Sequence, residues 1–358
     1  MPRKVVYEAK IEHLQILNEE GKVDKAVGVP EALTPERLSE MYRWMLFFRR
    51  FDEKALALQR TGRLGTYASL IGQEATQVGA AYAMEKQDWL VPSFREQGIM
   101  MLRGVPGSKI ITYWNGDERG SHFEEGINCL PICVPVGSQL CHGVGLAIAM
   151  AKRKQDAVVL SFVGDGGTSE GDFHEACNFA GAFNAPAVIL IQNNHWAISV
   201  PRHKQTAATT LAQKAIAYGM PGLQFDGNDV MASYVATQEA LNWARSGNGP
   251  MLLEAVTFRM EDHTTADDAT KYRDDAEVEA WRPRDPLLRL EKYLRRKKKL
   301  NNNIIKTWEA EIAQEVAREV EAREALSAPD PLDTFRHLYA EIPQHLEAQM
   351  QEMKESLT

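Results

Sequence analysis

The sequence predicts an α/β fold built on a parallel sheet, and three observations support this prediction. Two apolar runs, residues 158–163 and 187–192, have the length and character of buried strands. The stretch between them, about 170–183, has the composition of a helix. Each run is followed directly by a polar loop, and a right-handed βαβ unit places both loops at the ligand-binding edge of the sheet.

The N-terminal residues 1–35 are expected to form an extended arm with a turn at 18–21. A helix should follow, because Thr34 is a typical N-cap and Pro35 suits the first helical position. Apolar residues then recur at helical spacing and predict a buried stripe. The stripe comprises Leu38, Met41, Met45 and Phe48.

Later in the chain, residues 139–154 are rich in Gly and Ala and predict a closely packed helix. A late strand should end at 256–258. After about residue 275 the composition shifts to charged helix formers, and apolar residues at helical spacing around 308–316 predict a packed helical region. We therefore divide the chain into an arm (1–35), an α/β domain (36–275) and a C-terminal helical region (276–358).

The basic run 295–299 is interpreted as a solvated helix end rather than a binding patch. The net charge of −8 argues against nucleic acid or an anionic membrane surface as a partner. No apolar run is long enough to span a membrane, and the glutamate-rich N-terminus fits neither a signal nor a transit peptide. The four cysteines lack metal-binding spacing, so we expect reduced core thiols and a cytoplasmic protein.

Two loops at the expected sheet edge carry the candidate chemistry. Gly164-Asp165-Gly166 follows the first strand, and Asn194 follows the second. The carboxylate of Asp165 and the amide oxygen of Asn194 would suit Mg²⁺, which prefers oxygen ligands and few protein groups. Backbone N–H groups of Gly166 and Gly167, at the start of the following helix, would suit an anion. The pattern therefore predicts a metal and a diphosphate at one spot.

Two common phosphate motifs do not fit this loop. A P-loop requires Lys after its second glycine, but Asp172 occupies that place. A dinucleotide fingerprint requires a third glycine where Ser169 stands. For the tripeptide 164–166 taken alone, a plain turn remains an equal alternative, which the paired asparagine motif makes much weaker.

From about residue 14 to 346 the chain resembles the alpha subunits of the thiamine-diphosphate-dependent, heterotetrameric 2-oxo acid dehydrogenases. These proteins belong to the pyruvate, branched-chain 2-oxo acid and acetoin dehydrogenase complexes. The matching segments are 60–64, 72–75, 94–96, 164–173, 192–199, 263–268 and 272–273. The resemblance implies a three-layer, parallel-sheet thiamine diphosphate-binding fold with a C-terminal helical region.

Within this family, residues 166–173 and 178–183 look most like the bacterial pyruvate-type subunits. The resemblance therefore implies decarboxylation of pyruvate and transfer of the acetyl group to lipoyl. A branched-chain 2-oxo acid such as 2-oxoisovalerate is the next alternative, since Thr66 replaces a bulky aromatic residue of relatives. A non-catalytic assembly paralog is a further alternative, but Asp165, Asn194 and His263 are all present.

The length of the chain has a consequence for its partners. Only one metal–diphosphate unit is visible, and no internal repeat supplies a second. In this family the aminopyrimidine-binding half and the activating glutamate would then come from a beta subunit in an alpha2-beta2 heterotetramer. The lipoyl domain and core of a dihydrolipoyl acyltransferase would be the further partners.

The resemblance also assigns roles to single residues. It implies that the backbone carbonyl of Trp196, where relatives have Tyr, is a third Mg²⁺ ligand beside Asp165 and Asn194. Arg95 would clamp the diphosphate, although an isolated Arg is more often a surface residue. Further cofactor contacts are implied for Phe94, which lacks the hydroxyl of the usual Tyr, and for Val136, Gly164, Gly166, Gly167 and Ala197. A plain core valine is a nearly equal alternative for Val136.

His263 is the candidate catalytic residue. It precedes an acidic stretch in a loop that, in the family, becomes ordered when cofactor binds. It would contact the diphosphate and guide the acyl group to the lipoyl arm. An exposed loop residue without a role is the alternative. Other candidates are weaker: Ser138 and Gln139 align with a monovalent-cation site, and His142, His174 and His195 are expected to be structural or interfacial.

Overall fold

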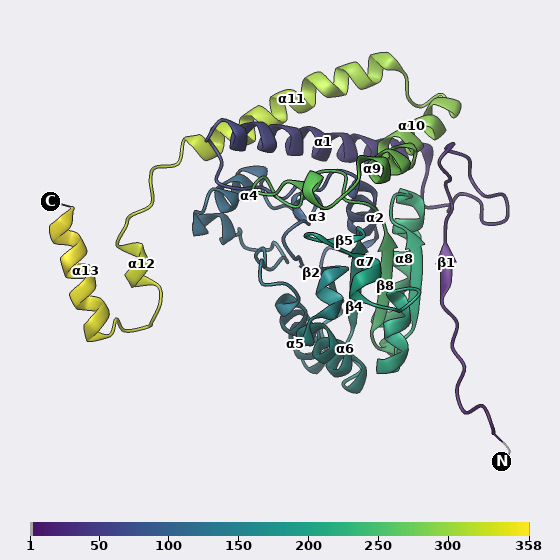
Figure 1. Cartoon of the computed structure of the whole chain (residues 1–358), viewed down its shortest axis with the longest axis horizontal. Helices are drawn as coiled ribbons and strands as arrows, with labels where there is room; N and C mark the ends of the chain where they lie inside the picture. The colour runs from purple at the N-terminus through teal and green to yellow at the C-terminus, as the bar shows by residue number, and fades with distance from the viewer. Residues whose placement is uncertain (1–2, 358) are drawn as a thin grey trace.

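A computed structural model describes residues 3–357 and shows one six-stranded, entirely parallel sheet (Figure 1). Its strands, in spatial order, are β1 (Glu12–Leu14), β7 (Gly222–Asp226), β8 (Met251–Val256), β4 (Ala187–Asn193), β3 (Val159–Gly164) and β2 (Trp89–Val91). A separate antiparallel hairpin consists of β5 (Trp196–Ala197) and β6 (Val200–Pro201). The predicted α/β fold with a parallel sheet is therefore confirmed.

The central βαβ unit matches the prediction closely. Strands β3 and β4 pair in parallel from Val159 opposite Ala187 to Gly164 opposite Gln192, and all seven residues of β4 are buried. A 3₁₀ turn, Gly166–Ser169, precedes the connecting helix α6 (Gly171–Ala182). The helix therefore begins one residue later than the predicted start at about residue 170, because Glu170 has an extended backbone and serves as its N-cap.

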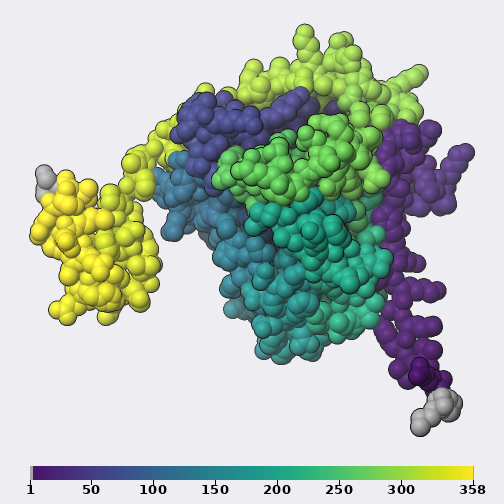
Figure 2. All heavy atoms as spheres, in the orientation of Figure 1, coloured from purple at the N-terminus to yellow at the C-terminus, as the bar shows by residue number. Residues whose placement is uncertain are grey.

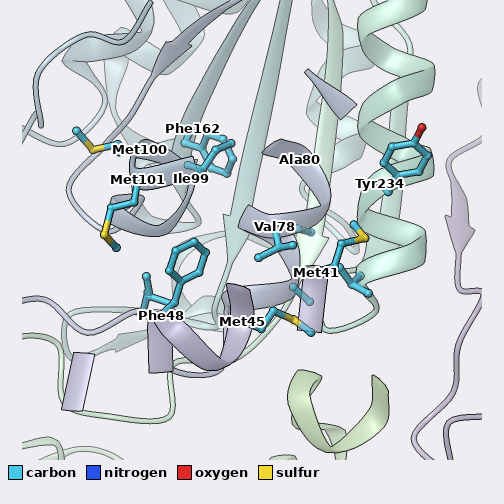
Figure 3. Packing of buried hydrophobic residues seen from close by; sticks show 14 of the residues in the cluster. Met41, Met45, Phe48, Val78, Ala80, Ile99, Met100, Met101, Phe162 and Tyr234 are labelled. Atoms are coloured by element: carbon cyan, nitrogen blue, oxygen red, sulfur yellow. The ribbon is translucent and has the colours of Figure 1, made fainter. Parts of the chain in front are cut away.

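Helices cover both faces of the sheet, and alternate strand residues point to two separate cores. On one face, Leu160 and Phe162 pack with α1 (Pro35–Arg60), α2 (Glu74–Ala83) and α8 (Val230–Trp243). Figure 3 shows part of this core around Met41, Met45, Phe48, Val78 and Phe162. On the opposite face, Val159, Val163, Ile189 and Ile191 pack with α5 (Ser138–Lys152) and α6. This arrangement is a three-layer structure.

The first long helix has the predicted start. Thr34 is the N-cap of α1, its hydroxyl accepts a hydrogen bond from the backbone N–H of Arg37, and Pro35 is the first helical residue. The predicted stripe of Leu38, Met41, Met45 and Phe48 is buried. The remaining shorter helices are α3 (Gln97–Leu102), α4 (Gly107–Trp114) and α7 (Arg202–Gln205), with 3₁₀ or π turns at Glu118–Ser121, Ala212–Tyr218, Ala244–Asn248, Ala269–Lys271 and Arg282–Arg284.

The N-terminal arm is not only an extended segment, because part of it belongs to the sheet. Its strand β1 extends the sheet by pairing in parallel with β7. The carboxylate of Asp229 accepts hydrogen bonds from the backbone N–H groups of Ile16 and Leu17 at 2.7 and 2.6 Å and also caps α8. The predicted turn at 18–21 is present, closed by a hydrogen bond from the N–H of Gly21 to the carbonyl of Asn18.

The C-terminal region is helical and has two parts. Its helices are α9 (Asp275–Trp281), α10 (Pro286–Arg296), α11 (Asn302–Glu324), α12 (Asp333–Arg336) and α13 (Gln344–Ser356). Helices α10 and α11 pack on α1, and Ile312 and Val316 are buried as predicted. The last segment, with α12 and α13, stands away from the body (Figures 1 and 2), and α13 has no buried residue.

The basic run 295–299 is a solvated helix end as predicted, because all five residues are exposed and α10 ends at Arg296. Arg296 also donates hydrogen bonds to the carbonyls of Glu20 and Gly21, and Lys299 pairs with Glu36 at 2.5 Å. One further sequence interpretation needs correction. All four cysteines are free, but Cys141 is exposed and Cys133 half-buried, so only Cys129 and Cys177 are core thiols. Within residues 3–357, no helix combines the length and apolar character needed to cross a membrane.

Candidate functional site

A cavity of about 210 Å³ lies at the carboxyl ends of β3 and β4. Every residue that the sequence analysis assigned to the cofactor or the metal lines it. These residues are Phe94, Arg95, Val136, Gly164, Asp165, Gly166, Gly167, Asn194, Trp196, Ala197 and His263. The structure therefore brings together residues that are up to 169 positions apart in the chain. A larger cavity of about 650 Å³ adjoins it at Trp196.

Asp165 places a carboxylate without a cationic partner in this cavity. Its side chain is 2% exposed, and burial raises its pKa to about 6. Glu74, another buried acid, pairs with Arg49 at 2.5 Å, whereas Asp165 makes no ion pair with any residue in the described range 3–357. A buried, unpaired carboxylate is energetically unfavourable, and a bound divalent cation would relieve this.

Asn194 is held with its amide oxygen available. Its Nδ2 atom donates to Oε1 of Gln73 at 3.3 Å, and the same oxygen accepts from Gln192 at 2.8 Å. Gln73 thus fixes the NH₂ end of the Asn194 amide. The Oδ1 atom accepts one hydrogen bond, from the backbone N–H of Trp196 at 3.2 Å, and keeps a second lone pair. The donor set of Asp165 and Asn194 therefore fits a hard cation.

The glycines let the turn approach its neighbours closely. A Cβ atom on Gly166 would lie 2.5 Å from Cβ of Ala197, in the β5–β6 hairpin. A Cβ atom on Gly167 would collide with the side chain of Val163. Only glycine allows the turn that follows Asp165 to lie against both segments. The backbone of this turn consequently forms part of the cavity wall.

The hairpin that carries Trp196 has an unusual backbone. His195 and Ile198 have positive φ angles of 71° and 53°, which cost free energy for non-glycine residues. Both conformations are supported by hydrogen bonds to their carbonyls. The backbone N–H of Arg202 donates to His195 and Nη2 of Arg259 donates to Ile198, each at 2.9 Å. The position of the Trp196 carbonyl is thus determined by the surrounding structure.

Arg95 provides a buried positive charge in the same cavity. It is 4% exposed, so the surface alternative is wrong. Its guanidinium donates to the carbonyl of Ser69 and, at 2.9 Å, to that of His263. Burial, followed by repulsion from Arg259, lowers its pKa to about 10. Neither arginine makes an ion pair with an acid in the part of the chain that the structure describes, so the site favours an anion.

His263 is neutral and fixed in orientation. Its Nδ1 atom lies 3.3 Å from Nη2 of Arg95 and 3.3 Å from Nη1 of Arg259. Because guanidinium groups only donate, Nδ1 must accept and the ring proton lies on Nε2. Burial, then the charges of Arg95 and Arg259, lowers the pKa of His263 to about 3. The alternative of an exposed loop residue is wrong.

The loop that carries His263 is held by its own polar contacts. Asp267 accepts hydrogen bonds from the backbone N–H of His263, at 2.9 Å, and from the hydroxyl of Tyr272. The Tyr272 hydroxyl in turn accepts from Nη2 of Arg259 at 2.7 Å. Arg259 also donates to the carbonyl of Trp196 at 3.4 Å. It therefore connects His263 to the hairpin.

The aromatic and apolar residues of the cavity lining correct one alternative, that Val136 is a core residue. The ring of Phe94 meets that of His263 edge-on, with centroids 5.7 Å apart. Val136 is 44% exposed and Ile198 is 56% exposed, so Val136 is not a core valine. Both side chains line the cavity and are open to solvent.

The weaker candidates lie outside this cavity lining. Gln139 donates to the carbonyl of Phe162 at 2.8 Å, and Ser138 donates to that of Pro135 at 2.9 Å. The hydroxyl of Thr66 lies 3.3 Å from that of Thr265. The rings of His195 and Trp281 are 5.3 Å apart, which fits a structural histidine.

Three polar residues near the site were missed by the sequence analysis. Gln73 lies within a matching segment and could have been found there. Arg259 follows the end of β8 but has no motif of its own. Gln205, from α7, donates to Oδ2 of Asp165 at 3.1 Å, and nothing in its local sequence indicates this contact.

Comparisons with known proteins agree with this geometry. The family model described as "Dehydrogenase E1 component" matches residues 42–332. The 3-methyl-2-oxobutanoate dehydrogenase subunit alpha of Mycobacterium tuberculosis (strain CDC 1551 / Oshkosh) is 41% identical, over 99% of this chain and 97% of the relative. The pyruvate dehydrogenase E1 component subunit alpha of Staphylococcus aureus (strain Mu50 / ATCC 700699) is also 41% identical, over 97% and 94%. The chain therefore belongs to the dehydrogenase E1 component family, as one of its 2-oxo acid dehydrogenase alpha subunits.

Proposed function

We propose that this subunit decarboxylates pyruvate and passes the acetyl group to the lipoyl group of a dihydrolipoyl acyltransferase. The family depends on thiamine diphosphate. The observation that carries the proposal is one cavity with an unpaired buried carboxylate, Asp165, and an unpaired buried guanidinium, Arg95. A metal–diphosphate pair supplies both missing charges.

The residues divide between the metal and the organic cofactor. Asp165, Asn194 and the carbonyl of Trp196 would hold Mg²⁺. The guanidinium of Arg95 and the backbone of Gly166 and Gly167 would bind the diphosphate. The remaining lining would contact the rest of the cofactor: Phe94, Val136, Gly164 and Ala197. Thiamine diphosphate supplies, when bound, the nucleophilic carbon and the electron sink that decarboxylation requires.

His263 would act as a hydrogen-bond donor through Nε2. Arg95 and Arg259 occupy its Nδ1 atom, which fixes the tautomer and leaves the Nε2 proton for a ligand in the cavity. An anionic oxygen of the cofactor or of the reacting acyl group is the appropriate acceptor. Bound negative charge would also raise the pKa of His263 above its value in the ligand-free chain, which makes proton transfer accessible.

A beta subunit would complete the site. Val136 and Ile198 are apolar, line the cavity and are exposed, which suits coverage by a second chain. We therefore propose an alpha2-beta2 heterotetramer that presents its active site to the lipoyl domain of the acyltransferase.

A branched-chain 2-oxo acid is the second candidate substrate. Relatives named for 3-methyl-2-oxobutanoate and for pyruvate share the same 41% identity with this chain. Thr66, smaller than the aromatic residue of relatives, would also allow a wider acyl pocket. A non-catalytic paralog is disfavoured, because Asp165, Asn194 and His263 line one cavity.

The test uses the chain co-expressed with a candidate beta chain. Calorimetry should detect thiamine diphosphate binding that requires Mg²⁺, and turnover with an artificial electron acceptor should be faster with pyruvate than with 2-oxoisovalerate. Faster turnover of 2-oxoisovalerate would transfer the assignment to the branched-chain class. Binding of ATP or NAD without binding of thiamine diphosphate would contradict the proposal.

A further inference from the structure

Gln205 contacts the candidate metal ligand Asp165 from outside the βαβ unit. Its Nε2 atom donates to Oδ2 of Asp165 at 3.1 Å and lies 3.4 Å from the carbonyl of Val200. The two amide hydrogens therefore have two acceptors, which fixes the plane of the Gln205 amide. The contact spans 40 residues of sequence.

The segment that carries Gln205 is anchored independently of Asp165. The backbone N–H of Arg202 donates to the carbonyl of His195 at 2.9 Å, and its guanidinium donates to the carbonyls of Ala208 and Thr209. Farther along, Nζ of Lys214 donates to the carbonyl and hydroxyl of Thr168 at 2.5 and 2.9 Å. Residues 202–214 thus hold both ends of the turn that begins at Asp165.

We infer that Gln205 is a positioning residue that orients the carboxylate of Asp165 for Mg²⁺. This inference rests on the proposed function. A hydrogen bond to Oδ2 restricts rotation of the carboxylate and leaves Oδ1 available as a metal ligand. Groups that orient a ligand in this way commonly change metal affinity when they are removed.

The chemistry of the amide suits this role. A neutral donor holds the carboxylate without neutralising it, whereas a lysine at the same place would compete with the cation for its charge. The glycine at position 166 contributes as well, since the side-chain oxygen of Gln205 lies 3.7 Å from where its Cβ would be. The Gly166 position and the Gln205 amide are therefore packed together beside Asp165.

The test compares two matched substitutions in the co-expressed alpha–beta complex. Gln205→Met removes the donor and keeps the length of the side chain. Gln213→Met makes the same change nearby, at a side chain that accepts from the backbone of Thr210 and does not contact Asp165. For each complex, calorimetry measures the Mg²⁺ concentration that gives half-maximal thiamine diphosphate binding, and thermal unfolding checks the fold.

We expect Gln205→Met to raise the half-saturating Mg²⁺ concentration about 10–100-fold. Binding should recover at high Mg²⁺, and Gln213→Met should match the wild type. If Gln205→Met weakens thiamine diphosphate binding equally at all Mg²⁺ concentrations, or leaves its Mg²⁺ dependence unchanged, the inference is wrong. If Gln205→Met does not fold, Gln205→Asn, which is too short to reach, takes its place with the same expectation.

Failure of the proposed function would look different. In that case the wild-type complex itself would show no Mg²⁺-dependent binding of thiamine diphosphate, and the inference about Gln205 would fall with it. Normal wild-type binding with an unaltered Gln205→Met complex would overturn the positioning role alone.

Discussion

At the scale of single residues, the site is defined by charges that the chain itself leaves uncompensated. Asp165 is a buried anion, and Arg95 and Arg259 are buried cations that repel each other. Arg289, a further buried arginine, does pair with an acid, Asp226, at 2.6 Å. Because these uncompensated groups lie in one cavity, they would suit the proposed ligand, which supplies both a cation and anionic oxygens.

The environment of His263 leads to a prediction for pH dependence. Its pKa is about 3 in the folded chain and about 6.5 when unfolded, so below pH 6.5 the unfolded chain gains a proton that the folded chain does not. Between pH 7 and 5 this should lower the free energy of unfolding of the cofactor-free chain by roughly 1–2 kcal/mol. Urea unfolding should show this as a difference between the two proteins: from pH 7 to 5 the wild type should lose more stability, or gain less, than His263→Gln, because buried acids such as Asp165 titrate in both. Identical profiles would contradict a buried, neutral His263.

Removal of the His263 side chain should separate binding from acyl transfer. His263→Ala should fold and bind thiamine diphosphate with Mg²⁺ in the complex, because Asp165, Asn194 and Arg95 remain. Reductive acylation of a lipoyl domain should fall by about 10²-fold or more, as for other proton-transfer residues. Mass spectrometry of the lipoyl domain measures this step. His345→Ala, a change at an exposed residue of α13, is the control, and full acylation by His263→Ala would remove it from the mechanism.

At the scale of elements, the βαβ unit positions the proposed metal ligands, and the hairpin and the loop after β8 complete the cavity. The unit could be predicted because buried parallel strands are continuous apolar runs with short polar loops at their ends. Strand β1 could not, since two of its three residues are exposed and its partner β7 lies more than 200 residues away. The contacts of Gln205 and Arg259 could not be predicted from the sequence either. They join segments that are far apart in the chain and that only the topology of the fold brings together.

Close packing between two of these elements gives a prediction. In Gly166→Ala the new Cβ would lie 2.5 Å from Cβ of Ala197, so the turn and the hairpin must separate. Thiamine diphosphate affinity should fall at least about tenfold, since catalytic sites lose function with displacements of about 1 Å. Gly171→Ala is the matched control, because its Cβ would meet no atom within 4 Å. Calorimetry on both complexes measures the thiamine diphosphate affinity. Equal affinities in Gly166→Ala and Gly171→Ala would contradict the prediction and show that the hairpin tolerates displacement.

At the scale of the whole molecule, the chain has a cavity that is open on one side and carries segments that extend beyond its body. The cavity is open where Val136 and Ile198 are exposed, and α12 and α13 stand apart (Figure 2). The sequence predicted the helical C-terminus but not this separation. The helical spacing of apolar residues in α11 predicts that this helix packs, and Ile312, Val316 and Val320 are buried. In α13 no residue is buried.

The proposed beta subunit leads to the last prediction. The isolated chain should bind Mg²⁺ and thiamine diphosphate at least about tenfold more weakly than the alpha–beta complex, because the apolar rim of the cavity is uncovered. Parallel titrations of the two preparations by calorimetry provide the measurement. Equal affinity would mean that this chain holds the cofactor by itself, and the proposed division of the site between two subunits would be wrong.

Whether Asp165 and Asn194 converge on one metal ion can be measured in a crystal of the alpha–beta complex grown with thiamine diphosphate and Mn²⁺ in place of Mg²⁺. Anomalous scattering would locate the ion independently of the protein atoms. We expect a single peak at about 2.0–2.3 Å from a carboxylate oxygen of Asp165, Oδ1 of Asn194 and the carbonyl of Trp196, next to the diphosphate. A peak coordinated by other residues, or a bound cofactor with both side chains turned away from the metal, would contradict it.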